Sequence, residues 1–342
     1  MKTTLKNVTE ALRKRNYEFT TFATGAAGKI LLLPKFGRVL GFWSDPEQQS
    51  HFWINEDFLK SESEHWQNPG GHRMWIAPER EFFIKDLDNV WDTYLAPEAF
   101  DPGNYKHRTE ANVIILENQG SARAFASNIE VSFKLTRKIQ ALSCEAIKKF
   151  IPTDQITAAG YEEQTTLETC NSTALKVGLW SLVQINPGGV ASVLAKNKPE
   201  YTTFFGHPDK ALSISGDIIS TRFSPQGEWL FKIGLKASTV ENKIIYLQKY
   251  TDGTASAIIK VIELGHDRDY ADTPWDQPND LGYAIQLFYG SNYGFGELES
   301  HSPVHLDPTG RPSCDTKTEV YAIKGSQKQI RDIIESLLAK RG

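Results

Sequence analysis

The chain is 342 residues long, with 40% hydrophobic residues, 23% charged residues and a formal net charge of −4. This composition is typical of a folded globular protein, and the small acidic excess argues against a nucleic-acid partner. No stretch approaches the ~18 consecutive apolar residues that a membrane-spanning helix needs. The first residues also lack the apolar segment of a secretory signal. We therefore expect a cytoplasmic protein without a membrane partner, and the sequence predicts no particular oligomeric state.

Two helices are expected, one near each end of the chain. Leu5, Val8 and Leu12 follow helical spacing, and the pattern ends near Asn16. The second helix is predicted over residues 326–341, where Ser326 and Gln329 form a capping box in front of an apolar stripe. We expect this second helix to cover a face or an edge of a sheet.

The residues between these helices favour an all-β fold. Short runs rich in β-branched and aromatic residues are bounded by Gly, Pro, Asn and Asp. They predict strands at 29–33, 38–43, 112–117, 129–135, 165–170, 176–185, 229–235, 243–249, 257–264, 283–289, 296–300 and 319–324. No helical pattern separates consecutive strands, so antiparallel sheets packed face to face are expected. Residues 136–150 fit either a strand or a helix. No linker divides the chain, which predicts a single domain over 1–342 with its β core at about 20–325.

The segment from Asn68 to Glu79 concentrates chemical groups behind a tight turn. Pro69, Gly70 and Gly71 allow a positive φ. His72, Arg73, Trp75 and Glu79 then follow within eight residues. Hydrogen-bonding groups beside a flat apolar ring suit a sugar, which has polar edges and apolar C–H faces. The alternative is a glycine-rich turn that leads into a strand with Trp75 in the core.

Metal and cofactor signals are weak in this sequence. Cys144, Cys170 and Cys314 form no C-x-x-C pair, so free thiols are the first expectation, with a single disulfide left open. His266, His301 and His305 have no metal-ligand spacing, and His207 lies in a turn. The acidic run Asp267–Asp280 is expected to be a long surface loop near a binding face, and it leaves a calcium site open without the strict calcium-loop spacing. Nucleotide-binding glycine motifs are absent. We expect no cofactor and no metal.

Three segments in this order resemble one superfamily. They are Leu33–Phe42 followed by the Gly70-Gly71-His72 turn, Asn171–Leu182, and Gly294–Pro303. Together they resemble the galactose mutarotase-like superfamily over about residues 29–325. The match is closest to the uncharacterised branches that carry Gly-Gly-x-[Arg/Lys]-x-Trp-x-Ala-Pro and Glu-Leu-Glu-x-x-x-Pro. Phe231-Lys232-Ile233-Gly234 also resembles these branches. The resemblance implies a β-supersandwich of two large sheets with a sugar site on the concave face of one sheet.

The resemblance also implies acid–base chemistry at an anomeric carbon. In mutarotases of this superfamily a glutamate removes the proton of the anomeric hydroxyl and a histidine protonates the ring oxygen. Leu298-Glu299 matches the glutamate strand, so Glu299 is the expected base. The segment that carries the family's histidine reads Leu179-Trp180-Ser181-Leu182 here and has none. His72 is the candidate for the acid, or else it only binds a hydroxyl.

Further residues are candidates for binding the sugar. Glu297 and Glu299 are two positions apart on a predicted strand and should share one face. By the same parity Gln184 should lie beside Trp180, which either stacks on the sugar or fills the core. Arg222 could hold a carboxylate, and Glu79 could form an ion pair with Arg73.

The sequence therefore predicts a carbohydrate-active protein that resembles an aldose 1-epimerase and acts on a sugar or a sugar acid. Two alternatives stay open. The first is a carbohydrate-binding protein without turnover, and the second is a glycoside-cleaving enzyme that uses the same cleft. A second carboxylate about 5–10 Å from Glu299 would favour the glycoside-cleaving enzyme.

Overall fold

The computed structural model describes residues 2–61, 67–152, 154–171, 175–196, 198–265, 268–307 and 309–339. Parts of some predictions lie outside these residues. They are Ser172–Ala174 in the second family-like segment, His266, Asp267 at the start of the acidic loop, and the end of the C-terminal helix at Lys340 and Arg341.

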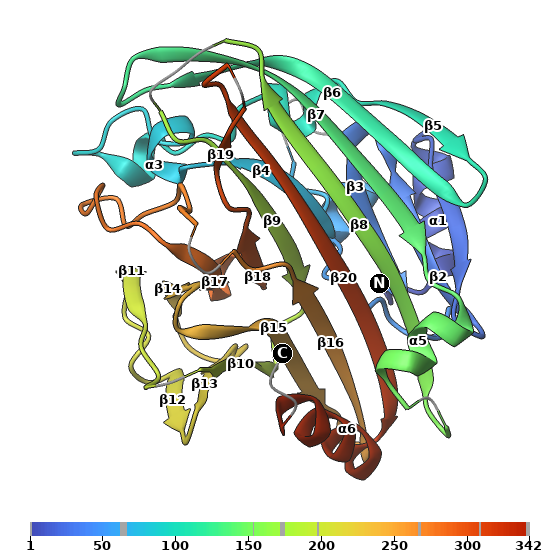
Figure 1. Ribbon diagram of the computed structural model, residues 1–342. Coiled ribbons are helices and arrows are strands. Elements are labelled where there is room, and N and C mark those ends of the chain that lie inside the picture. The colour runs from blue at the N-terminus through green and yellow to red at the C-terminus, as the bar shows by residue number, and fades with distance from the viewer. Residues whose placement is uncertain are drawn as a thin grey trace.

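Within the described residues, nine antiparallel strands form the first sheet (Figure 1). In spatial order they are β1 (Thr20–Thr24), β2 (Gly28–Leu33), β3 (Arg38–Trp43), β4 (His72–Ala77), β9 (Gly178–Ile185), β18 (Phe295–His301), β17 (Tyr283–Gly290), β14 (Leu230–Lys236) and β11 (Thr202–Gly206).

Eleven strands of the described chain form the second antiparallel sheet. In spatial order they are β12 (Leu212–Ser215), β13 (Ile218–Arg222), β10 (Gly189–Ala195), β15 (Val240–Lys249), β16 (Thr254–Ile262), β20 (Pro312–Ser326), β8 (Thr157–Thr169), β7 (Ile129–Ala141), β6 (Val113–Ala124) and β5 (Lys106–Glu110), with β19 (His305–Leu306) paired to β20.

Helices lie at the ends of the chain and in the loops. They are α1 (Leu5–Lys14), α2 (Glu56–Lys60), α3 (Glu79–Phe82), α4 (Val90–Thr93), α5 (Cys144–Phe150) and α6 (Gln327–Ala339), with short helical turns at η1 (Pro34–Phe36), η2 (Ala99–Gly103) and η3 (Ser291–Tyr293). Within the described residues, none of these helices is long and apolar enough to cross a membrane.

The main hydrophobic core fills the space between the two sheets. Val183, Leu287 and Leu298 of the first sheet face Ile258 and Val320 of the second, and all five side chains are fully or almost fully buried. Such burial on both inner faces is what holds a sandwich together, because each sheet removes the apolar face of the other from water. The all-β supersandwich predicted from the sequence is confirmed.

The terminal helices cover outer faces of the two sheets. Val8 and Leu12 of α1 pack in one cluster with Leu31 and Trp43 of the first sheet. On the second sheet, Ile330 of α6 packs in another cluster with residues of β16 and β20. The predicted capping box forms in front of α6, where the Ser326 backbone N–H donates to Gln329 Oε1 at 3.0 Å. The reciprocal bond joins the Gln329 backbone N–H and Ser326 Oγ at 3.3 Å.

Local sequence preferences explain most of the strand bounds. Residues 136–150 divide into both of the predicted alternatives, because β7 runs on to Ala141 and α5 begins at Cys144. Ser143 caps α5 by accepting a hydrogen bond from the Ala146 backbone N–H at 3.2 Å. The short strands β1, β5, β10 to β13 and β19 were missed. Their pairing partners, rather than a strong local pattern, hold them in the sheets.

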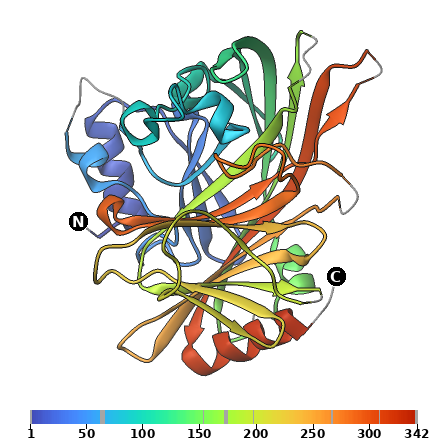
Figure 2. The ribbon, with the colours of Figure 1, turned by 90° about the vertical axis from the view of Figure 1, so that its left-hand side faces the viewer.

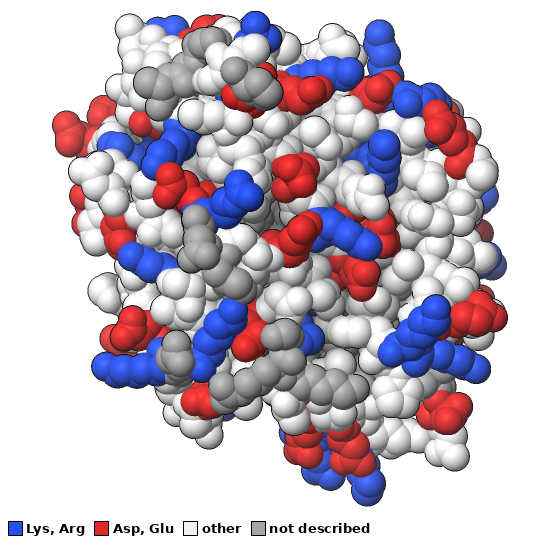
Figure 3. All heavy atoms as spheres, in the orientation of Figure 1, with Lys and Arg blue, Asp and Glu red and all other residues white. Residues whose placement is uncertain are grey.

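The outer face of the second sheet carries mixed charges. In Figure 3, which has the orientation of Figure 1, basic and acidic side chains alternate over this face. One such pair joins Lys317 Nζ of β20 and Glu162 Oε2 of β8 at 2.7 Å. Interspersed charges of this kind suit a solvated surface. Figure 2 shows the side of the molecule on which α3, α4 and the loop before β17 lie. Residues of these segments line the candidate site, on the outer face of the first sheet.

Candidate functional site

A cavity of about 330 Å³ opens on the outer face of the nine-stranded sheet. Its walls combine nine aromatic rings with three carboxylates, a lysine and an arginine. The lining residues are Asn68, Arg73, Trp75, Glu79, Trp91, Tyr94, Trp180, Phe205, Lys232, Trp275, Phe288, Tyr293, Phe295, Glu297 and Glu299.

Strand register places the floor of this cavity. Arg73 of β4 and Glu299 of β18 both lie opposite Leu182 of β9, so the three residues share one face of the sheet. Two positions along, Glu297 lies opposite Gln184. The prediction that Glu297 and Glu299 share a face is thereby confirmed.

The turn before β4 brings the backbone close to its neighbours. Gly70 and Gly71 have φ values of +98° and +82°. A Cβ atom on Gly70 would lie 2.3 Å from the Trp53 carbonyl oxygen, and one on Gly71 would lie 2.3 Å from that of Val39. Both positions therefore need glycine, which agrees with the interpretation of this segment as a tight turn.

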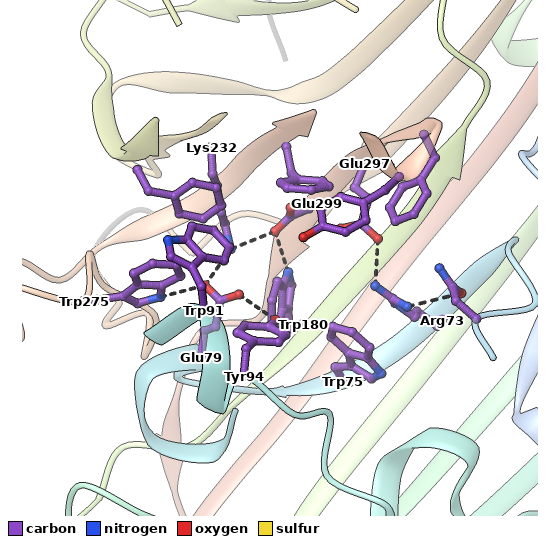
Figure 4. A pocket seen from close by; sticks show the side chains of 15 residues that line it. Arg73, Trp75, Glu79, Trp91, Tyr94, Trp180, Lys232, Trp275, Glu297 and Glu299 are labelled. Carbon is purple, nitrogen blue, oxygen red and sulfur yellow. Dashed lines mark hydrogen bonds and ion pairs between the residues drawn. The ribbon is translucent and has the colours of Figure 1, made fainter. Parts of the chain in front are cut away.

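One lysine joins two carboxylates in the centre of the cavity, and we call Glu79, Lys232 and Glu299 the pocket cluster (Figure 4). Lys232 Nζ lies 3.2 Å from Glu79 Oε2 and 3.3 Å from Glu299 Oε2. The indole N–H of Trp180 donates to Glu299 Oε2 at 2.7 Å. The other oxygen, Glu299 Oε1, has no hydrogen-bond partner although it is buried. This oxygen is the unsatisfied acceptor of the site.

The surroundings of Glu299 favour its protonated form. Burial raises the pKa of Glu299 to about 8, and the nearby carboxylates of Glu297 and Glu79 act in the same direction. The charge of Lys232 offsets this only in part, because Lys232 also neutralises Glu79. The carboxylates of Glu299, Glu79 and Asp272 together raise the pKa of Lys232, against the effect of its burial. Glu299 thus titrates close to neutral pH, where a proton-transfer group is most effective.

A second ion pair lies beside the pocket cluster. Arg73 Nη2 donates to Glu297 Oε1 at 2.8 Å, and Gln184 Nε2 donates to the same oxygen at 3.0 Å. The Arg73 guanidinium stacks over the Trp75 ring at 3.5 Å from its centroid. Burial raises the pKa of Glu297, while Arg73 opposes the shift. Arg73 is therefore already paired in the cavity.

Loops from distant parts of the chain hold Glu79 over the floor. Tyr94 Oη and Trp275 Nε1 both donate to its carboxylate, at 2.8 and 3.1 Å. The Glu79 backbone N–H donates to Asp272 Oδ1 at 2.7 Å. Trp275 and Asp272 belong to the acidic loop that was expected near a binding face.

The expectation that His72 shares the cleft with Glu299 is wrong. Neighbouring residues of a strand point to opposite faces, and Arg73 takes the cavity side. His72 lies between the sheets instead, with its ring nitrogens 2.7 Å from Tyr161 Oη and 2.8 Å from Ser181 Oγ. Burial lowers its pKa to about 3, so the ring is neutral at pH 7.

Two further expectations are corrected. Glu79 pairs with Lys232 rather than with Arg73, whose partner is Glu297. Arg222 is exposed on β13 of the second sheet and does not line the cavity. Its neighbours Thr221 and Phe223 are buried, so strand alternation turns Arg222 towards solvent.

Several lining residues were not singled out as site residues from the sequence, above all Lys232, Trp91, Phe205, Trp275 and Phe288. One signal was present, because Lys232 interrupts an apolar strand and a buried lysine needs a charged partner. The aromatic residues gave no such signal, since rings in strands usually fill cores.

Histidines and metal ligands are the other groups that supply acid or metal chemistry in sites of this kind. Among the described residues that line the cavity there is no histidine. His301 lies beside the cavity, where its ring stacks on Trp180 at 5.7 Å between centroids. Within the described part of the chain, no group of three or more His, Cys, Asp and Glu side chains is arranged to hold a metal ion.

Comparison with solved structures assigns the fold. A candidate aldose 1-epimerase from Escherichia coli K12 is similar, with a TM-score of 0.50 and 10% identity, over 90% of this chain and 100% of that chain. A galactose mutarotase related enzyme from Lactobacillus acidophilus has a TM-score of 0.47 and 7% identity, over 90% and 98% of the two chains. The first of these similarities gives the protein a galactose mutarotase-like β-sandwich fold, as the sequence resemblance predicted.

The sequence itself places the chain in a family. It belongs to a family of unknown function (DUF6786), whose model matches residues 4–341. No curated protein matches its sequence. Because one fold can carry many activities, the function has to be argued from the cavity.

Proposed function

We propose that the protein binds a neutral reducing sugar in this cavity and exchanges its anomers by acid–base chemistry. The observation that carries the proposal is Glu299. It is 1% exposed, lines an aromatic cavity, has a pKa raised to about 8 and keeps one oxygen without a partner. The hydroxyl of a bound sugar would satisfy that oxygen.

The chemistry of the walls favours a neutral sugar over a sugar acid. Aromatic faces such as those of Trp75 and Trp180 suit the C–H faces of a pyranose ring. The two cations that line the described cavity are already neutralised, Arg73 by Glu297 and Lys232 by Glu79 and Glu299. A carboxylate on the ligand would meet three glutamates and no spare positive charge.

The proposed reaction moves one proton at each end of the ring-opening step. Ionised Glu299 accepts the proton of the anomeric hydroxyl while the bond between C1 and the ring oxygen breaks. The ammonium of Lys232 donates to the ring oxygen, so that an open-chain aldehyde results. Rotation about the C1–C2 bond and the reverse proton transfers give the other anomer, with no net change in protons. Lys232 here takes the role that a histidine has in mutarotases.

The test is anomer exchange measured by one-dimensional NMR. Freshly dissolved α-anomers of glucose, galactose, mannose and xylose are mixed with the protein, and the approach to equilibrium is compared with the spontaneous rate. Glu299→Gln preserves the shape of the side chain and removes its basicity. We expect a loss of about 10²–10⁴-fold in the catalysed rate, the usual contribution of general-base catalysis.

The matched control is Glu162→Gln on the outer face of the second sheet, which should exchange anomers at the wild-type rate. An unchanged rate in Glu299→Gln would contradict the assignment of the base. If the wild type does not accelerate anomer exchange but binds one of these sugars in calorimetry, the result would instead support a binding protein without turnover. The absence of a histidine among the described lining residues is the observation that favours this second candidate.

Glycoside cleavage remains a third outcome of the same experiment. Glu79 and Glu299 supply two carboxylates, but the same ammonium pairs with both of them. Release of a monosaccharide from a methyl glycoside, lost in Glu299→Gln, would replace anomer exchange as the function.

A further inference from the structure

We propose that the substrate is a reducing disaccharide or a longer reducing glycan, whose second sugar ring stacks on an aromatic platform formed by Trp91, Phe205 and Trp275. The inference rests on the proposed function, and it names the substrate class of the same site.

The platform is a compact group of rings at one end of the cavity. Phe205 and Trp275 are stacked, with ring centroids 4.8 Å apart and planes at 21°. Trp91 contacts both edge-on, at 5.1 Å from Phe205 and 5.3 Å from Trp275. The three rings come from α4, β11 and the loop before β17, which are far apart in the sequence. Tertiary packing therefore assembles a surface that no single segment contains.

Exposure of the platform indicates a surface that a ligand can cover. The Trp91 side chain is 52% exposed although all three rings line the cavity. An indole left half in water beside stacked aromatic rings gains free energy when a flat apolar surface covers it. None of the three rings carries a charge, so the platform suits the C–H face of a sugar rather than an ionic group.

The platform and Glu299 lie at different places along the cavity. Phe205 lies on β11 at the edge of the sheet, whereas Glu299 lies on β18, three strands further in. Neighbouring strands are spaced at about 4.8 Å, which separates the two backbones by about 14 Å. Lys232 on β14 and Glu79 bridge the space between them, and Trp275 donates to Glu79. The cavity is thus continuous from the platform to the proposed base.

The chemistry of anomer exchange limits how the second sugar ring can be bonded to the reacting sugar. Anomer exchange needs a free hydroxyl on C1, because an acetal at C1 cannot open. The unit on the platform therefore cannot be an aglycone bonded through C1 of the reacting sugar. It has to be joined through another hydroxyl of that sugar, as the non-reducing residue of a disaccharide is.

The experiment compares rates of anomer exchange for disaccharides and for their reducing-end monosaccharides. Two-dimensional exchange NMR is recorded on lactose, cellobiose and maltose, each against glucose. We expect at least one disaccharide to show a kcat/KM about tenfold or more above that of glucose. Trp91→Ala should reduce the ratio of the two kcat/KM values about fivefold to tenfold, as expected for the loss of one stacking contact. Phe205→Ala should reduce it in the same direction.

The control is Ile214→Ala, which removes an exposed apolar side chain from β12 of the other sheet and should leave the ratio unchanged. Equal kcat/KM values for glucose and all three disaccharides, together with an unchanged ratio in Trp91→Ala, would overturn the inference and leave the proposed function standing. Absence of both exchange and binding for every sugar would overturn the proposed function and this inference together.

Discussion

Two groups of buried titratable residues lie on opposite faces of the first sheet, and they differ in how their carboxylates are paired. The pocket cluster of Glu79, Lys232 and Glu299 lies on the outer face of the first sheet. The second group, which we call the inter-sheet cluster, consists of His72, Arg137 and Glu163 between the two sheets. Glu299 and Glu163 are each 1% exposed, so burial alone does not distinguish them.

The pKa values of the two carboxyl groups are shifted in opposite directions because the groups are paired differently. Burial on its own would raise the pKa of Glu163, but Arg137 binds it through two hydrogen bonds of 2.6 and 3.0 Å and lowers the pKa to about 2. Glu299 instead shares one lysine with Glu79, and burial raises its pKa to about 8. Bidentate pairing with an arginine stabilises the ionised form, whereas a shared lysine leaves an excess of negative charge.

This difference gives a criterion for functional carboxylates. Glu163 is satisfied on both oxygens, by Arg137, and by the Thr165 hydroxyl at 2.8 Å. Glu299 keeps one oxygen free and faces a cavity. Lys260 of β16 reaches the floor of the cavity from the side of the second sheet. Its Nζ donates to the carbonyls of Ser181 and Leu298, which lie on strands of that floor. The inter-sheet side therefore supports the floor, and the cavity side carries the proposed chemistry.

The largest expected effect tests the structural role of the inter-sheet cluster. Arg137→Met leaves Glu163 buried without its main partner, and we expect a loss of about 3–5 kcal/mol in the free energy of unfolding. Urea denaturation followed by circular dichroism measures this change. Arg108→Met is the control, because Arg108 forms exposed pairs with Glu110 and Glu117, and its loss should change the free energy of unfolding little. Equal effects of the two variants would remove the distinction between buried and exposed pairs.

A smaller loss of stability is expected when His72 is replaced. This variant tests whether His72 contributes to stability without taking part in turnover. His72→Ala leaves the hydroxyls of Tyr161 and Ser181 without their partner, which should cost about 2–4 kcal/mol of stability. Because the ring lies on the far side of the sheet from the cavity, the rate of anomer exchange per folded molecule should stay at the wild-type value. A large loss of rate with little loss of stability would mean that His72 takes part in the reaction.

The third effect is the pH dependence of stability that Glu299 contributes. Its pKa is 4.5 when unperturbed and about 8 in the folded protein. Between these values the unfolded chain has lost the proton and the folded chain keeps it, so stability falls as the pH rises, by at most about 1.4 kcal/mol per pH unit. The unfolding free energy of the wild type relative to Glu299→Gln should therefore decrease from pH 5 to pH 8. A difference that is constant or increases with pH would mean that burial does not raise this pKa.

Local patterns predicted the architecture well because they act over a few residues. Alternation of apolar and polar side chains indicated β7, and the Ser326 and Gln329 pair indicated where α6 begins. Parity correctly placed Glu297 with Glu299, and Gln184 with Trp180, on common faces. The same parity rule separates His72 from Arg73, but which of the two faces the cavity depends on the register between β4 and β9.

The sequence by itself determined the all-β class, the terminal helices, the glycine turn before β4 and a strand that carries two glutamates on one face. Those features follow from backbone sterics and short-range periodicity. Only the tertiary structure decided that Lys232 joins Glu79 to Glu299, that Trp91, Phe205 and Trp275 form one platform, and that His72 is sealed between the sheets. These contacts join residues up to 184 positions apart, as Trp91 and Trp275 are, and pairing of strands and closure of loops bring them together. No local pattern records such pairing, because its free energy arises from burying surfaces that meet only in the folded chain.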